Sequence, residues 1–138
     1  MTVLADTSAW VEFQLATDSP PDLRLVDLLS GPPGVVAWTE PVLMELTAGA
    51  HTDRAAMELR DMLSTATLLP LLPDTDFESA SRIYRRCRSV GVTPRGLIDC
   101  VIAAVAQRTG ASVLSHDHDL ARIADVIGIP LDEASLRP

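Results

Sequence analysis

The sequence contains no lysine, and all 11 of its basic residues are arginines. Reactions that depend on a lysine amine, such as P-loop nucleotide hydrolysis and Schiff-base chemistry, are therefore excluded. A phospho-acceptor signalling domain also combines aspartates at strand ends with magnesium. We disfavour that class because it too requires a lysine.

Aromatic residues are also scarce, at 4% of the chain, whereas apolar residues make up 47%. This balance predicts a core of Leu, Val, Ile and Ala, as in α/β proteins, and argues against disorder. Cysteine is rare too, and the two that occur, Cys87 and Cys100, do not have the spacing of metal ligands. We expect both to be reduced thiols that pack inside helices.

No apolar run reaches the roughly 18 to 20 residues that a membrane span needs, and no basic stretch precedes an apolar run near Met1. We therefore expect a cytoplasmic protein without membrane contact. The length of 138 residues predicts a single domain over residues 1–138. The formal net charge of −8 repels nucleic acid on average, so a role on a polyanion requires bound cations or a local basic patch.

Apolar strands alternate with amphipathic helices along the chain. We expect strands at residues 2–5, 35–37, 68–69 and 112–115, and an edge strand at 129–131. We expect helices at residues 7–15, 19–30, 39–49, 52–65, 75–90, 97–109 and 120–127, with caps at Thr39 and Thr52 and a capping box from Thr75 to Glu78. This order predicts an α/β fold in which a small parallel β-sheet is flanked by helices on both faces, in three layers. Such sheets bind ligands at the carboxyl ends of their strands.

One carboxylate lies in a helix that is otherwise apolar on every face. It belongs to Asp99, in the run from Leu97 to Ala106. Because a helix hydrophobic all round is buried, Asp99 must be paired, protonated or bound to a metal ion. The alternative is that Asp99, in the first turn, only interacts favourably with the helix dipole.

Further carboxylates are predicted at the same end of the sheet. Glu45 lies inside the apolar segment 42–46, Asp6 follows the first strand, and Asp117 and Asp119 follow the fourth. Taken singly, Glu45 could be exposed on an amphipathic helix and the aspartates could be ordinary caps. Taken together, four like charges within a few ångströms cannot all stay ionised without cations. Carboxylate ligands without a Cys or His framework select Mg²⁺ or Mn²⁺, which suits phosphodiester hydrolysis.

These carboxylates occur in four segments whose order and spacing extend over nearly the whole chain: Val3–Trp10, Thr39–Leu46, Gly96–Ala104 and Val113–Leu120. Together the segments resemble a PIN domain, specifically a VapC-type toxin of a type II toxin–antitoxin system. The resemblance implies a small parallel sheet with helices on both faces. It also implies a divalent-metal-dependent endoribonuclease that a cognate, VapB-like antitoxin holds inactive.

At matching positions, the resemblance implies an acidic catalytic quartet made of Asp6, Glu45, Asp99 and Asp117. Asp6 and Asp99 would be the principal metal ligands, and Asp117 would complete the metal site directly or through water. Glu45 would orient or deprotonate the attacking water.

The resemblance also implies supporting roles for residues next to the quartet. Thr7 or Ser8 would support Asp6 or a metal-bound water. Asp119 could exchange roles with Asp117, because only one residue separates them.

Arginines supply a candidate basic patch. At helical spacing Arg82, Arg85 and Arg86 share a face, and Arg95 directly precedes the helix of Asp99. We expect these four side chains to hold RNA phosphates near the metal site. The alternative is a solvated helix end that complements the helix dipole.

Apolar residues in the early helices exceed what one small sheet can cover: Leu23, Leu28, Leu29, Met57, Met62 and Leu63. With the resemblance, this excess predicts a homodimer that binds an antitoxin segment through an apolar groove near these early helices. The alternative function is a catalytically silent, PIN-like protein-interaction module. The intact acidic set favours the enzyme.

Overall fold

The computed structural model describes residues 1–138. Four short parallel strands form one sheet in the order β3-β2-β1-β4. Their bounds are β1 Val3–Ala5, β2 Val36–Trp38, β3 Thr67–Leu68 and β4 Ser112–Leu114. The strands and their parallel pairing confirm the predicted sheet, with most boundaries shifted by one residue.

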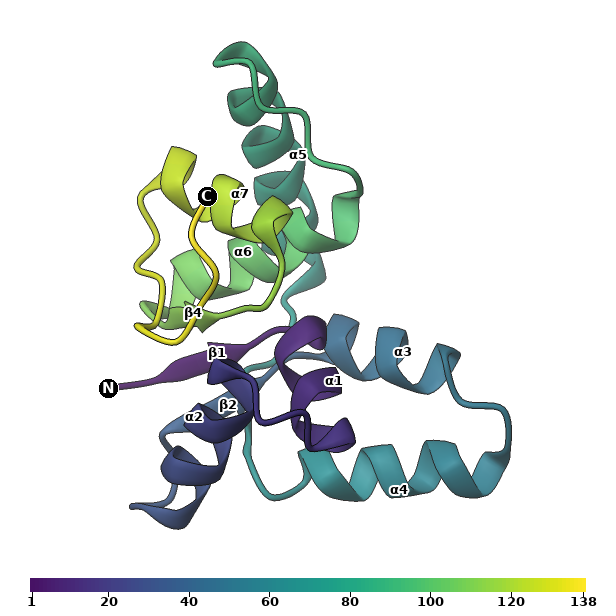
Figure 1. The fold of residues 1–138 in the computed structure, drawn as a ribbon. Helices are drawn as coiled ribbons and strands as arrows, with labels where there is room; N and C mark the ends of the chain where they lie inside the picture. The colour runs from purple at the N-terminus through teal and green to yellow at the C-terminus, as the bar shows by residue number, and fades with distance from the viewer.

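Seven helices surround the sheet: α1 Thr7–Leu15, α2 Pro20–Ser30, α3 Glu40–Ala48, α4 Asp53–Leu63, α5 Pro73–Ser89, α6 Leu97–Thr109 and α7 His118–Ile127. In Figure 1, α5, α6 and α7 lie above the sheet, and α1, α2 and α4 lie below it. This arrangement confirms the predicted three-layer α/β class. None of the helices combines the length and hydropathy that crossing a membrane requires.

The strand order places a topological switch point beside β1. The chain proceeds from β1 to β2 and β3 on one side, then returns to add β4 on the other side of β1. In open parallel sheets, the carboxyl ends of the strands at such a point form the ligand-binding crevice. Asp6 and Ser115 directly follow β1 and β4 and therefore lie at this crevice.

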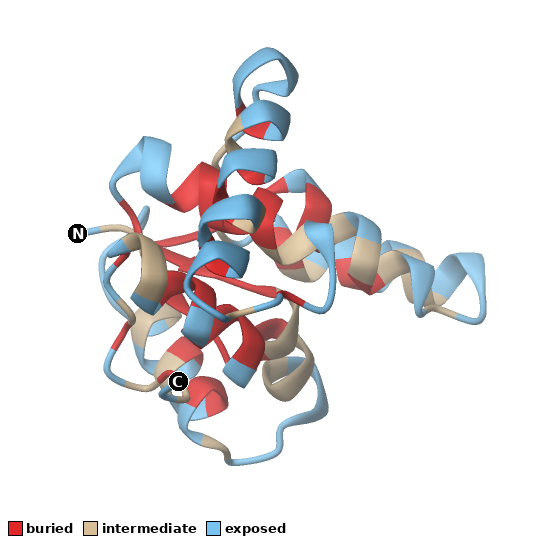
Figure 2. Cartoon of the chain, turned by 90° about the horizontal axis from the view of Figure 1, so that it is seen from above, coloured by how far each residue is buried: buried red, intermediate tan, exposed pale blue.

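The core is centred on β1, on most of β2 and β4, and on the middle of α6, and buried residues are red in Figure 2. The run from Cys100 to Ala106 is buried throughout, as expected for a helix that is apolar on every face. Cys87 and Cys100 are buried free thiols, so both are core residues as predicted. Leu63 is fully buried as well, and the prediction that it belongs to an uncovered apolar surface is wrong.

Helix starts are where the sequence-based predictions differ most from the structure. Helix α5 begins at Pro73, and the predicted capping box of Thr75 and Glu78 is wrong because the carboxylate of Asp76 accepts the N–H of Leu72 at 2.8 Å. Thr39 occupies the N-cap of α3, but its buried hydroxyl makes no capping bond.

The C-terminal segment supports β4 without forming a full strand. The predicted edge strand at 129–131 is reduced to a single parallel bridge between Leu131 and Val113. Beyond it, the hydroxyl of Ser135 accepts the backbone N–H of Ser115 at 3.1 Å. The segment therefore braces the loop that leads from β4 to α7.

Candidate active site

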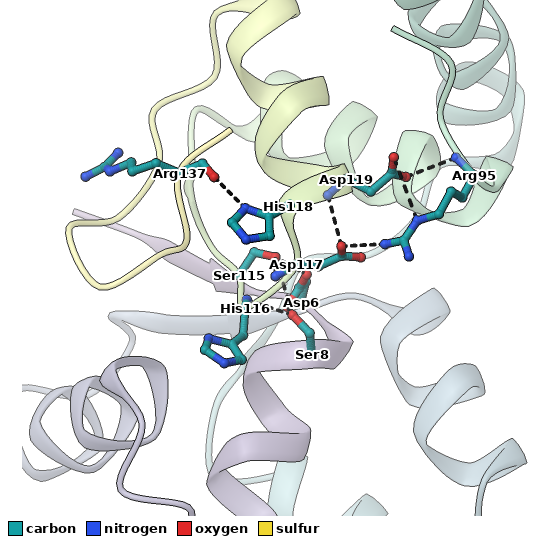
Figure 3. A network of polar contacts seen from close by, with 9 residues as sticks. All are labelled: Asp6, Ser8, Arg95, Ser115, His116, Asp117, His118, Asp119 and Arg137. Atoms are coloured by element: carbon teal, nitrogen blue, oxygen red, sulfur yellow. Dashed lines mark hydrogen bonds and ion pairs between the residues drawn. The ribbon is translucent and has the colours of Figure 1, made fainter.

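Asp6 is the most tightly bonded carboxylate of the site. It is the N-cap of α1, and its Oδ1 accepts the backbone N–H of Ala9 at 2.9 Å and the Ser8 hydroxyl at 2.6 Å. Its Oδ2 accepts the Ser115 hydroxyl at 2.5 Å (Figure 3). Burial raises the pKa of Asp6 to about 6, because its hydrogen bonds only partly offset the desolvation and the charge of Asp117 raises the pKa further.

Asp99 lies in the first turn of α6 and is half-buried. Burial raises its pKa to about 7, and the negative charges of Asp117, Asp6 and Glu45 contribute further to this increase. The other three carboxylates of the predicted quartet therefore lie close enough to raise the pKa of Asp99. A helix-dipole role alone does not explain Asp99, since a dipole would lower its pKa.

Glu45 reaches the site from α3, where it is half-buried. The hydroxyl of Thr7 donates to its Oε1 at 2.6 Å. Of the two hydroxyls predicted to support Asp6, only that of Ser8 bonds to Asp6, whereas Thr7 supports Glu45. This contact fixes the orientation of the Glu45 carboxylate relative to the start of α1.

Asp117 and Asp119 have different surroundings. Asp117 is the N-cap of α7, so this helix begins at His118 rather than at the predicted residue 120, and its Oδ1 accepts the N–H of Asp119 at 2.9 Å. Asp119 is buried, and its Oδ2 accepts the backbone N–H of Arg95 at 3.1 Å. Asp119 therefore fastens the segment before α6 to the start of α7, while the charge of Asp117 raises the pKa of both Asp6 and Asp99.

Ser115 is a site residue that the sequence reasoning did not single out. Its buried hydroxyl donates to Asp6 and also accepts the backbone N–H of Asp117 at 3.1 Å. One side chain thus links the Asp6 carboxylate, which follows β1, to the main chain of Asp117, which follows β4. The signal in the sequence was its position at the end of the expected fourth strand, directly before the run from His116 to Asp119.

The four predicted RNA-binding arginines do not form one cluster. Arg95 is next to the carboxylates, with its Nη2 2.6 Å from Oδ1 of Asp117. Arg82 and Arg86 line a hollow of about 350 Å³ together with Gln107. Gln107 is eight residues beyond Asp99, which is about 12 Å along the axis of α6. Their hollow is therefore distinct from the acidic site, and Arg85 is exposed on the same helix.

The donor chemistry of the quartet fits a divalent cation. All of its side-chain donors are carboxylate oxygens, and two of the carboxyl groups have raised pKa values because they are buried and because like charges lie nearby. In the structure, however, no group of three or more His, Cys, Asp or Glu side chains is arranged to enclose a metal ion. Asp117 bonds to Arg95 instead, so a metal site would require this side chain to adjust.

Comparisons with known proteins agree with this fold. A PIN domain family model matches residues 3–126. VapC ribonuclease Mb1587 of Mycobacterium bovis and ribonuclease VapC11 of Mycobacterium tuberculosis are each 38% identical to the chain, over 98% of this chain and 99% of each relative. The chain therefore belongs to the PIN domain family, and its similarity to VapC ribonucleases extends over almost its full length.

Solved structures show the same fold. A DNA-bound VapBC from Salmonella typhimurium aligns with a TM-score of 0.74, over 96% of this chain and 97% of that chain, at 20% identity. VapC20 of Mycobacterium tuberculosis, a toxin that cleaves the sarcin-ricin loop, aligns with a TM-score of 0.66 over 99% of this chain and 100% of that chain, also at 20% identity. These likenesses confirm the predicted PIN-like architecture.

Proposed function

We propose that this chain is an endoribonuclease toxin, a single PIN domain over residues 1–138, that hydrolyses RNA phosphodiester bonds with Mg²⁺ or Mn²⁺. The observation that carries the proposal is the gathering of carboxylates at the switch point of the sheet, where Ser115 joins the Asp6 carboxylate to the main chain of Asp117. The charges of Asp117, Asp6 and Glu45 also raise the pKa of Asp99. The 38% identity to proteins named VapC ribonucleases supports it. A cytoplasmic location is consistent with RNA as substrate.

Asp6, Asp99 and Asp117 would hold the divalent ion, which when bound activates a water and offsets charge on the transition state. Deprotonation of Asp6 and Asp99, which have pKa values of about 6 and about 7, prepares them as ligands. Glu45, oriented by Thr7, accepts the proton of the attacking water. Ser8 and Ser115 hold Asp6 in place through their hydroxyl groups. The RNA phosphates are bound by the predicted arginines, Arg82, Arg85, Arg86 and Arg95.

A cognate, VapB-like antitoxin is the proposed partner. The structural relatives include a VapBC complex from Salmonella typhimurium. A hollow of about 520 Å³ lies between α1, α3 and α4, with Val11, Leu46 and Leu59 among its lining residues. Thr7 and Glu45 also line it, so an antitoxin segment seated there reaches the Glu45 carboxylate.

A second copy of the chain is the other proposed partner, through a face formed by α3, α5 and α6. Met44, Phe77 and Leu97 are each more than half exposed there. Beside them is an apolar hollow of about 200 Å³, with Pro41 and Ile98 in its lining. Because Ile98 precedes Asp99, a dimer on this face would bring two acidic sites close together.

RNA cleavage by the purified chain tests the proposal. We expect cleavage in Mg²⁺ or Mn²⁺ and none in EDTA. Asp6→Asn and Asp99→Asn should abolish it, whereas Asp53→Asn, which changes an exposed first-turn carboxylate of α4, should not. A catalytically silent interaction module, the alternative function, would show no metal-dependent cleavage at all.

A further inference from the structure

Arg95 is the basic side chain that forms ion pairs with the carboxylates of the candidate site. Its Nη2 lies 2.6 Å from Oδ1 of Asp117, and its Nε lies 3.9 Å from Oδ1 of Asp119 (Figure 3). Its backbone N–H donates to the buried carboxylate of Asp119. The main chain of Arg95 is thus fastened, while its side chain is 73% exposed.

The carboxylates of the site differ in how their charge is compensated. Asp6 and Asp99 form no ion pair in the structure, and hydroxyl and N–H groups are the hydrogen-bond donors to Asp6. Asp117, in contrast, has a guanidinium on Oδ1, the oxygen that also accepts the Asp119 N–H. One cation therefore neutralises the carboxylate that would complete the proposed metal site.

An ion pair with so exposed a partner is easily broken. Exposed pairs contribute little to stability, because water screens them and the long side chain loses freedom in forming them. A divalent ion held by three carboxylates interacts with twice the charge and with all three groups at once. The balance at Asp117 therefore favours the metal ion over the exposed guanidinium.

We propose that Arg95 is a resident counter-ion of Asp117 that is exchanged for the divalent ion when metal binds. The exchange presupposes the metal site of the proposed function. Because the main chain of Arg95 is fixed by Asp119, only its side chain needs to move. The released guanidinium then lies at the rim of the site, where an RNA phosphate would approach. Metal binding and phosphate binding are thereby linked through one side chain.

Calorimetric titration of the metal-free protein with Mn²⁺ measures the affinity for the ion and tests the exchange. Arg95→Gln should bind Mn²⁺ about three- to tenfold more tightly than the unmodified chain, because nothing competes for Asp117. Arg54→Gln is the matched control, since Arg54 forms an exposed pair with Glu58 on α4 and its loss changes the net charge equally. It should leave the Mn²⁺ affinity unchanged.

A double-mutant cycle with Asp117→Asn separates exchange from a general field effect. If Arg95 competes for Asp117, Arg95→Gln no longer tightens Mn²⁺ binding in the Asp117→Asn background. Tightening that persists in that background overturns the exchange, as does an unchanged or weaker affinity of the single variant. If the unmodified chain binds no Mn²⁺, or binds it equally well after Asp99→Asn, the proposed function fails instead.

A measurement on the unmodified chain provides a second test. Addition of Mg²⁺ should shift the side-chain Nε–H signal of Arg95 in a ¹⁵N-correlated NMR spectrum. The signal is assigned by its loss in Arg95→Gln, and the corresponding signal of Arg54 should stay in place. An unmoved Arg95 signal at saturating Mg²⁺ overturns the exchange.

Discussion

The hydroxyl of Thr7 donates to Oε1 of Glu45 at 2.6 Å, across 38 positions of the sequence. The bond joins the first residue of α1 to the middle of α3, so the carboxylate proposed to accept a proton from water is held by a neighbouring helix. A base must lie within hydrogen-bond reach of the proton that it accepts. The position of Glu45 therefore depends on Thr7.

Thr7→Val tests this dependence. Valine keeps the shape of threonine but cannot donate, so Glu45 loses its fixed orientation. We expect kcat for RNA cleavage to fall roughly tenfold, the size typical of losing a group that orients a reacting one, with little change in KM. Thr7→Ser keeps the hydroxyl and should restore most of the rate. Equal losses in both variants would contradict the role of the hydrogen bond.

Asp99→Asn should abolish cleavage and stabilise the metal-free fold. The pKa of Asp99 is about 7 in the folded chain and about 3.9 in an unfolded one, so its ionisation costs stability as pH rises from about 4 to about 7. Asparagine removes this cost. We expect the Tm in EDTA to exceed that of the unmodified chain by roughly 5 °C at pH 8, with the difference vanishing near pH 4.

Two measurements on Asp99→Asn would contradict its assignment. One is cleavage above roughly a tenth of the unmodified rate in saturating Mg²⁺, because loss of a metal ligand costs more than that. The other is a Tm difference that does not depend on pH. Asp53→Asn provides the control, since its exposed carboxylate should change neither quantity.

Much of the fold follows from patterns that the sequence displays. The alternation of apolar strands and helices identified the parallel sheet, and the apolar run around Asp99 identified the buried helix α6. Helix starts were less predictable, because several side chains can cap one terminus. At α5 the Leu72 N–H donates to the Asp76 carboxylate, and the helix begins at Pro73 instead of at the expected capping box from Thr75 to Glu78.

The site was predictable in composition but not in its contacts. The quartet could be assembled because carboxyl ends of parallel strands share one edge of a sheet. The Thr7 to Glu45 and Ser115 to Asp6 bonds join distant segments, and only tertiary packing brings them together. Tertiary packing also separates Arg86 from Arg95. The packing of α5 against α6 and α7 decides where Arg86 lies.

Arg108 and Asp76 form the ion pair that fixes the start of α5 to the end of α6. Nε and Nη2 of Arg108 each lie 2.9 Å from an oxygen of Asp76, which is fully buried. Burial raises the pKa of Asp76, but the bonds from Arg108 and the Leu72 N–H outweigh it, and the net pKa is lowered. Arg108→Gln leaves this charge unpaired and should cost about 3 kcal/mol of unfolding free energy at pH 7.

The pH dependence of this effect has a definite sign. A lowered pKa in the folded chain contributes stability above the unfolded value of about 3.9, and this stability is lost as pH falls below it. Urea unfolding should therefore show a smaller loss for Arg108→Gln at pH 3 than at pH 7. Arg54→Gln, which breaks only an exposed pair, should show no measurable loss. A loss in Arg108→Gln that is equal at both pH values would mean that packing, not charge, is responsible.

Phe77→Asp tests the proposed dimer face. Phe77 is 55% exposed beside the apolar hollow of α3, α5 and α6, and a charge there would be buried by a second copy. The unmodified chain should sediment as a dimer at tens of micromolar, and Phe77→Asp as a monomer. Val90→Asp, at the exposed end of α5, should leave the dimer intact. A monomeric unmodified chain would contradict the dimer.

Arg82 and Arg86 can be tested for RNA binding without touching the acidic site, because they line a separate hollow. If both contact phosphates, replacing both with Gln should raise KM with little change in kcat, since uniform binding is lost and the carboxylates are untouched. The logarithmic slope of affinity against salt should fall by about 1.4, or about 0.7 for each lost contact with a single strand. If the two side chains only cover a solvated helix face, neither KM nor the slope will move. A fall in kcat alone would show that the hollow communicates with the carboxylates, which the spacing along α6 does not predict.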